Sequence, residues 1–126
     1  MPEQRRALIV EDETGVAMVL EKLLRSERYV TTHAADAIAG LEQVEAWRPD
    51  VILLDLTMPG VDGREFARRL RAMPGAAASV PIVVVTGVHG AEEAAVAVGA
   101  RATIRKPFTL DHIIATLDRV LGGASV

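Results

Sequence analysis

Short runs of consecutive apolar residues recur along the chain, and a longer segment with spaced apolar positions follows each of them. Residues 7–10, 51–54 and 82–85 are unbroken apolar runs, and residues 29–32 and 102–104 are weaker candidates of the same kind. Continuous rather than alternating hydrophobicity is typical of strands buried on both faces, as in a parallel sheet covered by helices. The pattern therefore predicts about five strands of a buried parallel sheet.

The segments between these runs have the spacing of amphipathic helices, with apolar residues three or four positions apart. The expected buried stripes of four helices are Val16, Val19, Leu20, Leu23 and Leu24; Ile38, Leu41 and Val44; Phe66, Leu70 and Met73; and Leu110, Ile113, Ile114, Leu117 and Leu121. Asp36 and Thr109 precede the second and the last stripe and are the expected N-caps. A fifth helix is predicted over residues 91–98, and we expect this Ala-rich segment, with little apolar bulk, to be the most mobile element.

About five strands alternating with five helices, joined by short connections, predict one doubly wound α/β domain. The length of 126 residues is that of a single domain. Glycines at the end of the last helical stripe lead us to expect a domain over residues 1–122 and a flexible tail over residues 123–126.

Composition narrows the classes of function. One Trp, one Tyr and two Phe leave few rings on which nucleic-acid bases could stack. A net charge of −3 and the lack of a basic run argue against direct binding of nucleic acid or of an anionic membrane surface. The absence of cysteine excludes disulfides and thiolate chemistry and fits a cytoplasmic location. The first residues do not resemble a signal peptide, and no apolar run approaches the roughly 20 residues of a membrane span.

Polar residues of the types that bind ions or react follow the predicted strands. Glu11 and Asp12 come after the first strand, Asp55 ends the third, Thr86 ends the fourth, and Lys106 follows the fifth. Ligands of open parallel sheets bind outside the carboxyl ends of the strands. If the first, third, fourth and fifth strands are neighbours, carboxylates, a hydroxyl and an ammonium converge at one edge.

The chemistry of such a cluster points to a divalent cation and a phosphoryl group. Neighbouring carboxylates repel one another unless a cation lies among them, and hard oxygen ligands select Mg²⁺, with Mn²⁺ as the alternative ion. The ammonium of Lys106 and the hydroxyl of Thr86 suit phosphoryl oxygens. Asp55, at the end of a buried strand, is a candidate nucleophile, so the chemistry suggested is an aspartyl phosphate.

Five motifs at these strand ends resemble the receiver domain of the two-component response regulator family over essentially the full chain. They are Leu-Ile-Val-Glu-Asp-Glu (8–13), Asp-Leu-Thr-Met-Pro-Gly-Val-Asp-Gly (55–63), Val-Val-Thr-Gly (84–87), Gly-Ala (99–100) and Lys-Pro-Phe (106–108). The resemblance implies a flavodoxin-like five-stranded parallel sheet of order 2-1-3-4-5 with helices on both faces.

The resemblance also implies a role for each residue of the metal site. Asp55 would be the phosphoacceptor and a metal ligand, Asp12 a direct ligand, and Glu11 a ligand acting through water. The family's remaining protein ligand is a backbone carbonyl two residues past the acceptor, here that of Thr57. Glu11 stands where the commoner residue is Asp, a mild change that should preserve metal binding.

Further residues are implied on the signalling side of the site. Thr86 would be the switch hydroxyl, Lys106 the phosphoryl contact, and Pro107 the family's cis peptide. Thr103 stands where receivers often carry an aromatic ring that moves inward on phosphorylation, so an aromatic switch is unavailable. Val88, two past Thr86, lacks a side-chain hydrogen bond for the hydrolytic water, which predicts slow self-dephosphorylation.

These observations predict a phosphorylation-dependent signalling switch rather than an enzyme, one that assists its own phosphorylation and dephosphorylation. The expected partners are a sensor histidine kinase or histidine phosphotransfer protein, which donates the phosphoryl group, and a downstream protein that the switched surface binds. The chain would act as a monomer or as a phosphorylation-dependent dimer.

Each residue of the cluster also has a purely structural interpretation. Asp55 could cap a turn, Glu11 and Asp12 could favour a helix N-terminus, Thr86 could be a buried β-branched residue, and Lys106 a solvated charge. Their joint position at strand ends favours the functional interpretation.

Rival functions use parts of the same pattern. A phosphatase of the haloacid dehalogenase type also begins with an aspartate such as Asp55, but it needs a second aspartate where Thr57 stands. A flavodoxin-like FMN module needs a first loop rich in Ser, Thr and Gly instead of carboxylates. A receiver-like fold that signals without phosphorylation is the nearest alternative.

Other polar residues carry weaker signals. His33, His89 and His112 share no spacing typical of a metal site, and we interpret them as surface or helix-turn groups, with a minor regulatory role open for His89. Trp47 is interpreted as a packing residue at the end of the second helix. A run of arginines is interpreted as a solvated helix face: Arg68, Arg69 and Arg71.

Overall fold

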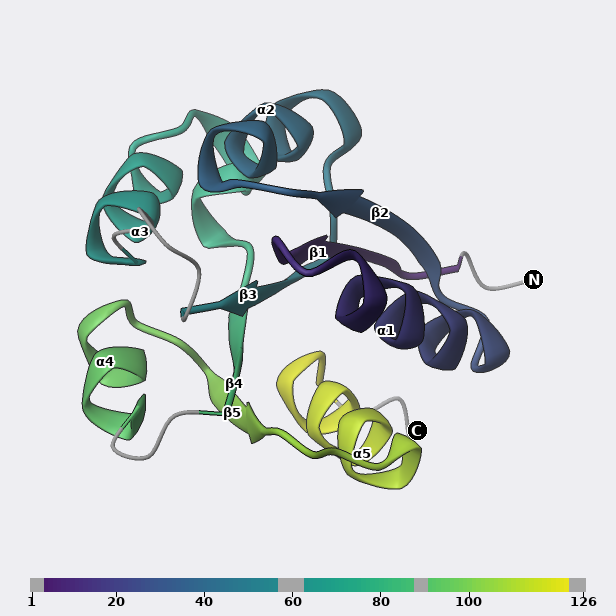
Figure 1. Cartoon of the computed structure of the whole chain (residues 1–126). Helices are drawn as coiled ribbons and strands as arrows, with labels where there is room; N and C mark the ends of the chain where they lie inside the picture. Colours follow the sequence, from purple (N-terminus) through teal and green to yellow (C-terminus); the bar gives the residue numbers. More distant parts are fainter. Residues whose placement is uncertain (1–3, 57–62, 88–90, 123–126) are drawn as a thin grey trace.

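The computed structural model describes residues 4–56, 63–87 and 91–122 (Figure 1). The predicted flexible tail, residues 123–126, lies outside this part of the chain. Strands and helices alternate in the order β1 (Arg6–Val10), α1 (Thr14–Ser26), β2 (Val30–Ala34), α2 (Ala37–Trp47), β3 (Val51–Asp55), α3 (Gly63–Arg71), the 3₁₀ helix η1 (Gly75–Ser79), β4 (Ile82–Thr86), α4 (Ala91–Ala97), β5 (Ala102–Arg105) and α5 (Leu110–Val120).

The five strands form one parallel sheet with the order β2-β1-β3-β4-β5, as the sequence and its resemblance predict. Every residue of β3 and β4 is buried, which explains why their sequences are continuously apolar. Val10 pairs with Leu54, and Asp55 pairs with Val85. The carboxyl ends of β1, β3 and β4 therefore lie level with one another at one edge of the sheet.

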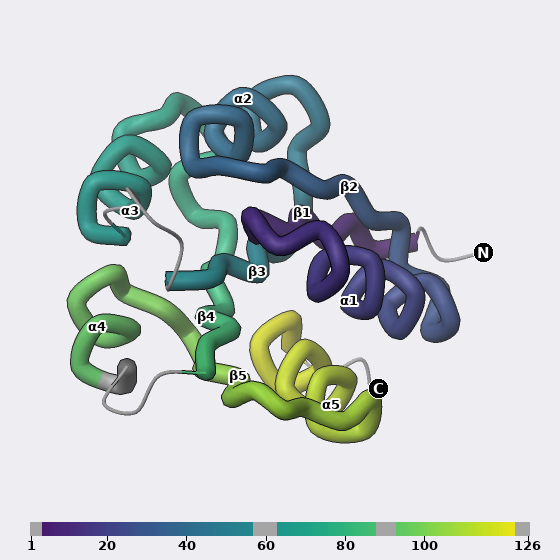
Figure 2. The backbone as a smooth tube through the Cα atoms, viewed as in Figure 1, coloured from purple at the N-terminus to yellow at the C-terminus, as the bar shows by residue number. Residues whose placement is uncertain are grey.

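Helices cover both faces of this sheet, which makes the fold doubly wound (Figure 2). α1 and α5 lie on one face and pack against each other, while α2, α3 and α4 lie on the other. Two buried apolar clusters result. The first joins the sheet to α2, α3 and α4 and includes Leu8, Val44, Phe66, Leu70, Ala95 and Val98. The second joins it to α1 and α5 and includes Ile9, Ala17, Leu20, Leu24, Ile113 and Leu117.

Both predicted N-caps are confirmed. The side chain of Asp36 accepts a hydrogen bond from the backbone N–H of Ala39 at 2.8 Å, and Thr109 accepts one from the N–H of His112 at 3.2 Å. These bonds satisfy amide groups that have no partner within the first turn of a helix. They fix where α2 and α5 begin.

The prediction of a core position is wrong for two residues: Val19 is 51% exposed and Ile38 is 66% exposed. In α2 the buried positions are Gly40 and Val44, so Val44 of the predicted stripe is confirmed, Leu41 is partly buried against the core, and only Ile38 is misplaced. A Cβ atom on Gly40 would lie 3.0 Å from a methyl carbon of Val10, so the backbone of α2 comes very close to β1 at this point. This close approach turns Ile38 toward solvent.

In α1 the buried stripe is that of the small residue Ala17 with Leu20 and Leu24, and Val19 lies beside it. Apolar spacing alone is compatible with two neighbouring stripes, and the packing of α1 on the sheet selects the one that contains the smallest side chain.

The segment between α3 and β4 holds an element that the apolar pattern did not predict. The 3₁₀ helix η1 begins at Gly75, whose φ of +71° suits glycine. The guanidinium of Arg71 donates hydrogen bonds to the carbonyls of Ala78 and Val80 at 3.1 and 3.0 Å. Arg71 thus ties α3 to the segment before β4 while its side chain stays exposed, and Arg68 and Arg69 form exposed ion pairs, so the predicted solvated face is confirmed. Among the described residues, no helix is long and apolar enough to cross a bilayer.

Candidate functional site

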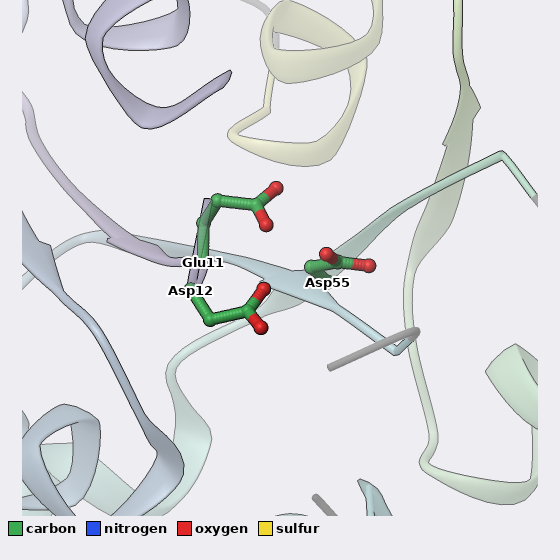
Figure 3. A group of neighbouring side chains, drawn as sticks. All are labelled: Glu11, Asp12 and Asp55. Carbon is green, nitrogen blue, oxygen red and sulfur yellow. The ribbon is translucent and has the colours of Figure 1, made fainter. Parts of the chain in front are cut away.

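Three carboxylates meet where the carboxyl ends of β1 and β3 lie side by side. Glu11, Asp12 and Asp55 each offer an oxygen, and these oxygens all lie within 4.8 Å of one another. Figure 3 shows the carboxylates of Glu11 and Asp12 directed toward that of Asp55. Glu11 and Asp55 are 1% and 2% exposed, whereas Asp12 is open to solvent. The structure thus brings together three of the residues that the sequence assigned to a metal site.

The backbone explains this convergence. Asp55 is the last residue of β3, and Glu11 comes directly after Val10, the residue that pairs with Leu54. Glu11 is therefore level with Asp55 on the neighbouring strand. One carboxylate oxygen of Glu11 accepts a hydrogen bond from the N–H of Glu13 at 3.2 Å, which draws the side chain back over the start of α1.

Lys106 places a positive charge beside the buried carboxylates. Its Nζ atom lies 3.3 Å from Oε1 of Glu11 and 3.6 Å from Oδ2 of Asp55. Its backbone N–H donates to the carbonyl of Thr86 at 2.8 Å, and its peptide bond to Pro107 is cis, as the resemblance predicts. One ammonium therefore lies against two of the three carboxylates, and the cluster holds more acidic than basic groups.

The pKa of Glu11 in this cluster is raised to about 7. Burial is the main cause, followed by the hydrogen bond with Asp55 and the negative charge of Asp55; the N–H of Glu13 and the charge of Lys106 act in the opposite direction. A buried group of carboxylates that cannot all ionise freely is a binding place for a cation. The ligand atoms are oxygens, and a hard divalent cation such as Mg²⁺ fits them best.

Thr86 and Thr103 lie on the β4–β5 side of the site. Thr86 is fully buried at the end of β4, one residue beyond Val85, which pairs with Asp55. Thr103 lies in β5, pairs with Val84 of β4 and is partly buried. Its position carries a short hydroxyl side chain and no ring. Thr57, Val88 and His89 were also singled out in the sequence, and they lie outside the described residues.

One contact of the site was missed by the sequence interpretation. Nε2 of His33 lies 2.6 Å from the backbone carbonyl oxygen of Glu11. The apolar pattern predicted that the second strand would end at residue 32, whereas β2 extends to Ala34. The two additional residues carry His33 to the carboxyl edge of the sheet. Because His33 is polar, the apolar pattern did not extend the strand to it. The signal for the longer strand is the pairing of Ile9 with His33, which only the structure shows.

Comparison with known proteins agrees with this geometry. The family model described as the response regulator receiver domain matches residues 7–118. The chain belongs to the response regulator receiver family. Sporulation initiation phosphotransferase F of Bacillus subtilis (strain 168) is 30% identical over 110 residues, which are 86% of each chain. Sensory transduction protein RegX3 of Mycobacterium tuberculosis is 35% identical over 116 residues, and this receiver spans 90% of its own length but about half (49%) of that relative's.

Solved structures show the same fold. A putative response regulator from Chloroflexus aurantiacus J-10-fl superposes with a TM-score of 0.87 at 30% identity, covering 95% of this receiver and 99% of that chain. The receiver domain of the sensor histidine kinase PA1611 from Pseudomonas aeruginosa PAO1, solved with a magnesium ion coordinated in its active-site cleft, gives 0.85 at 32% identity, with 96% and 100% coverage. The chain is thus a receiver, a phosphoacceptor signalling domain of two-component systems, and the family match favours it over the phosphatase and the FMN module.

Proposed function

We propose that Asp55 is the phosphoacceptor of this receiver and that a sensor histidine kinase or a histidine phosphotransfer protein is the donor. The observation that carries the proposal is the convergence on Asp55: oxygens of Glu11 and Asp12 lie within 4.8 Å, and Nζ of Lys106 lies 3.6 Å from its Oδ2. A carboxylate at the end of a buried strand, flanked by a cation site and by an ammonium, has the surroundings that phosphoryl transfer requires.

The same residues divide into two tasks. Asp12 and Asp55 would hold Mg²⁺ directly, Glu11 would act through water, and the carbonyl of Thr57 is the expected further ligand; Mn²⁺ is the alternative ion. The bound ion would neutralise negative charge on the carboxylates and on the phosphoryl oxygens. Lys106, already within reach of Asp55, would pair with a phosphoryl oxygen once the group is transferred.

In the transfer, a carboxylate oxygen of Asp55 attacks the phosphorus of the phosphohistidine. The new O–P bond forms as the N–P bond breaks, and the electron pair of the broken bond remains on the imidazole nitrogen of the donor. The product carries about −1.5 to −2 charges at the edge of the sheet. The hydroxyl of Thr86, at the end of the neighbouring strand, then moves toward a phosphoryl oxygen and donates a hydrogen bond to it. This movement of Thr86 changes the surface formed by β4, α4 and β5.

The signal is read by a protein, either a downstream target or a second phosphorylated copy of the chain. Because Thr103 replaces the usual ring, the change must pass through Thr86 and the α4 segment without an aromatic switch. We place the reaction in the cytoplasm, since the sequence has no cysteine and phosphohistidine donors act there. The domain contributes to its own phosphorylation and dephosphorylation but turns over no other substrate, and Val88 predicts slow decay of the acyl phosphate.

The decisive experiment is mass spectrometry of the intact protein after incubation with acetyl phosphate and Mg²⁺. Wild type is expected to gain one phosphoryl group, and Asp55→Asn none. Asp111→Asn, which removes an exposed carboxylate in the first turn of α5, is the matched control and should be modified like wild type. An unmodified wild type, or equal modification of Asp55→Asn, would contradict the proposal.

A further inference from the structure

The backbone of Glu11 is held at both of its polar groups by the end of β2. Its N–H donates to the carbonyl of Ala34 at 3.0 Å, and its carbonyl accepts from Nε2 of His33 at 2.6 Å. Two consecutive residues of β2 therefore hold the N–H and the carbonyl of one residue, which directly follows β1. The first of these bonds continues the ladder of the parallel sheet, whereas the second comes from a side chain.

The bond from His33 defines the state of its imidazole. A carbonyl oxygen only accepts hydrogen bonds, so Nε2 must carry a hydrogen for a contact of 2.6 Å to be favourable. His33 pairs with Ile9, two residues before Glu11, and its side chain thus reaches forward along β1 past the last paired position. Among neutral side chains, Gln carries an N–H donor at a similar reach.

The carbonyl that His33 holds belongs to the peptide bond between Glu11 and Asp12. The orientation of this peptide plane sets the direction in which Asp12 leaves β1, and so where its carboxylate lies relative to Asp55. Asp12 itself is open to solvent, and its position depends on the backbone that carries it. Glu11, in contrast, is buried and is held by further contacts with Glu13 and Lys106.

We propose that His33 is a positioning residue of the cation site, which orients the Glu11–Asp12 peptide through its hydrogen bond to the carbonyl of Glu11. The inference rests on the proposed function, because it assigns the pair Glu11 and Asp12 to a divalent cation. His33 does not touch the ion. It acts by holding the acidic pair in place before the ion arrives, which lowers the cost of ordering the site when the ion binds.

The test is the dissociation constant of Mg²⁺, measured by calorimetry on the full chain with no phosphoryl donor. His33→Ala is expected to weaken Mg²⁺ binding about tenfold, the usual loss when the partner of a metal ligand is removed. His33→Gln, which keeps a donor at similar reach, should restore most of the affinity. Thr32→Ala is the matched control in the same strand, on the opposite face of the sheet, and should bind Mg²⁺ like wild type.

A second measurement does not involve the ion. Long-range ¹H–¹⁵N NMR of the His33 imidazole at alkaline pH should show the neutral tautomer with hydrogen on Nε2. Hydrogen on Nδ1 would overturn the inference, as would a His33→Ala protein that binds Mg²⁺ as tightly as Thr32→Ala, or a His33→Gln protein that binds no better than His33→Ala. In these cases the wild type still binds Mg²⁺ and the proposed function stands. A wild type that binds no Mg²⁺ would overturn both.

Discussion

The two halves of the site are built differently. On the β1–β3 side, the buried carboxylate of Glu11 and the peptide that follows it are held by hydrogen bonds from Glu13, Lys106 and His33. On the β4–β5 side, the adjoining helix α4 has only seven residues; of its described side chains only Ala95 is buried, and Val96 is 79% exposed.

The difference separates binding from signalling. A cation site has to be ordered before the ion arrives, because ordering it on binding would weaken the affinity. A surface that reports a change of state has to lie close in energy to a second arrangement, and an element with few buried apolar groups meets that need. The more tightly held half is thus the proposed cation site, and the weakly packed half is the surface proposed to carry the signal.

The largest effect expected from this comparison concerns stability. Leu70 of α3 is fully buried in the cluster that also contains Val98, the residue after α4. Leu70→Ala should lower the free energy of unfolding by about 3 kcal/mol, because it leaves a cavity in a tightly packed region. Val98→Ala should cost about half as much, since it removes fewer atoms beside an element that can shift. Urea unfolding measures both, and equal losses would contradict the weaker packing of the α4 segment.

A second prediction concerns the cation. Mg²⁺ at about a hundred times its dissociation constant should stabilise wild type by about 2.7 kcal/mol, because the ion binds the folded state. Asp12→Asn should abolish this gain and leave the stability without Mg²⁺ nearly unchanged, since Asp12 is exposed. Thermal unfolding with and without Mg²⁺ provides the measurement.

Glu13→Gln is the control for this second prediction. The substitution changes the exposed carboxylate of a neighbouring residue. The contact of Glu13 with Glu11 is made by its backbone N–H, which the substitution keeps. If Glu13→Gln lost the Mg²⁺ effect as Asp12→Asn does, the assignment of the direct ligand would be wrong.

The smallest effect is expected on the exposed surface of α3. Hydrogen bonds from Arg68 and Arg69 lower the pKa of Glu65 to about 2. A carboxylate whose pKa is lower in the folded state stabilises the fold above its ordinary pKa of 4.5, and this contribution is lost as the pH falls from 4.5 toward 2.

Because the ion pairs of Glu65 are solvated, Glu65→Gln should change stability only slightly at neutral pH, and the small difference should vanish in high salt. Urea unfolding of both proteins at neutral and acidic pH measures the contribution. A large or salt-independent loss would show that this surface matters more than its exposure suggests.

The sequence predicted what depends on long apolar runs and on strand ends. Fully buried strands such as β3 and β4 have no polar face, so the apolar runs alone predict their positions. The positions of Glu11, Asp55 and Lys106 followed from the same reasoning, since strand ends meet at one edge of a parallel sheet.

What the sequence did not predict depends on how closely the elements approach one another. Ile38 was assigned to the core by its spacing, yet the approach of α2 to β1 at Gly40 determines which side of that helix is buried. The polar residue His33 was read as lying beyond its strand, because an edge strand with one partly exposed face lacks a continuous apolar run. Such features arise from tertiary distances, which spacing along one segment does not contain.

The ion pair between Lys106 and Glu11 joins residues 95 positions apart. Nearly all of the chain has to be in place before these two groups meet, and all five strands end at the edge where they lie. A chain still emerging from the ribosome, or one clipped before β5, lacks the ammonium that faces Asp55. The candidate site is therefore complete only when the whole five-stranded sheet has formed.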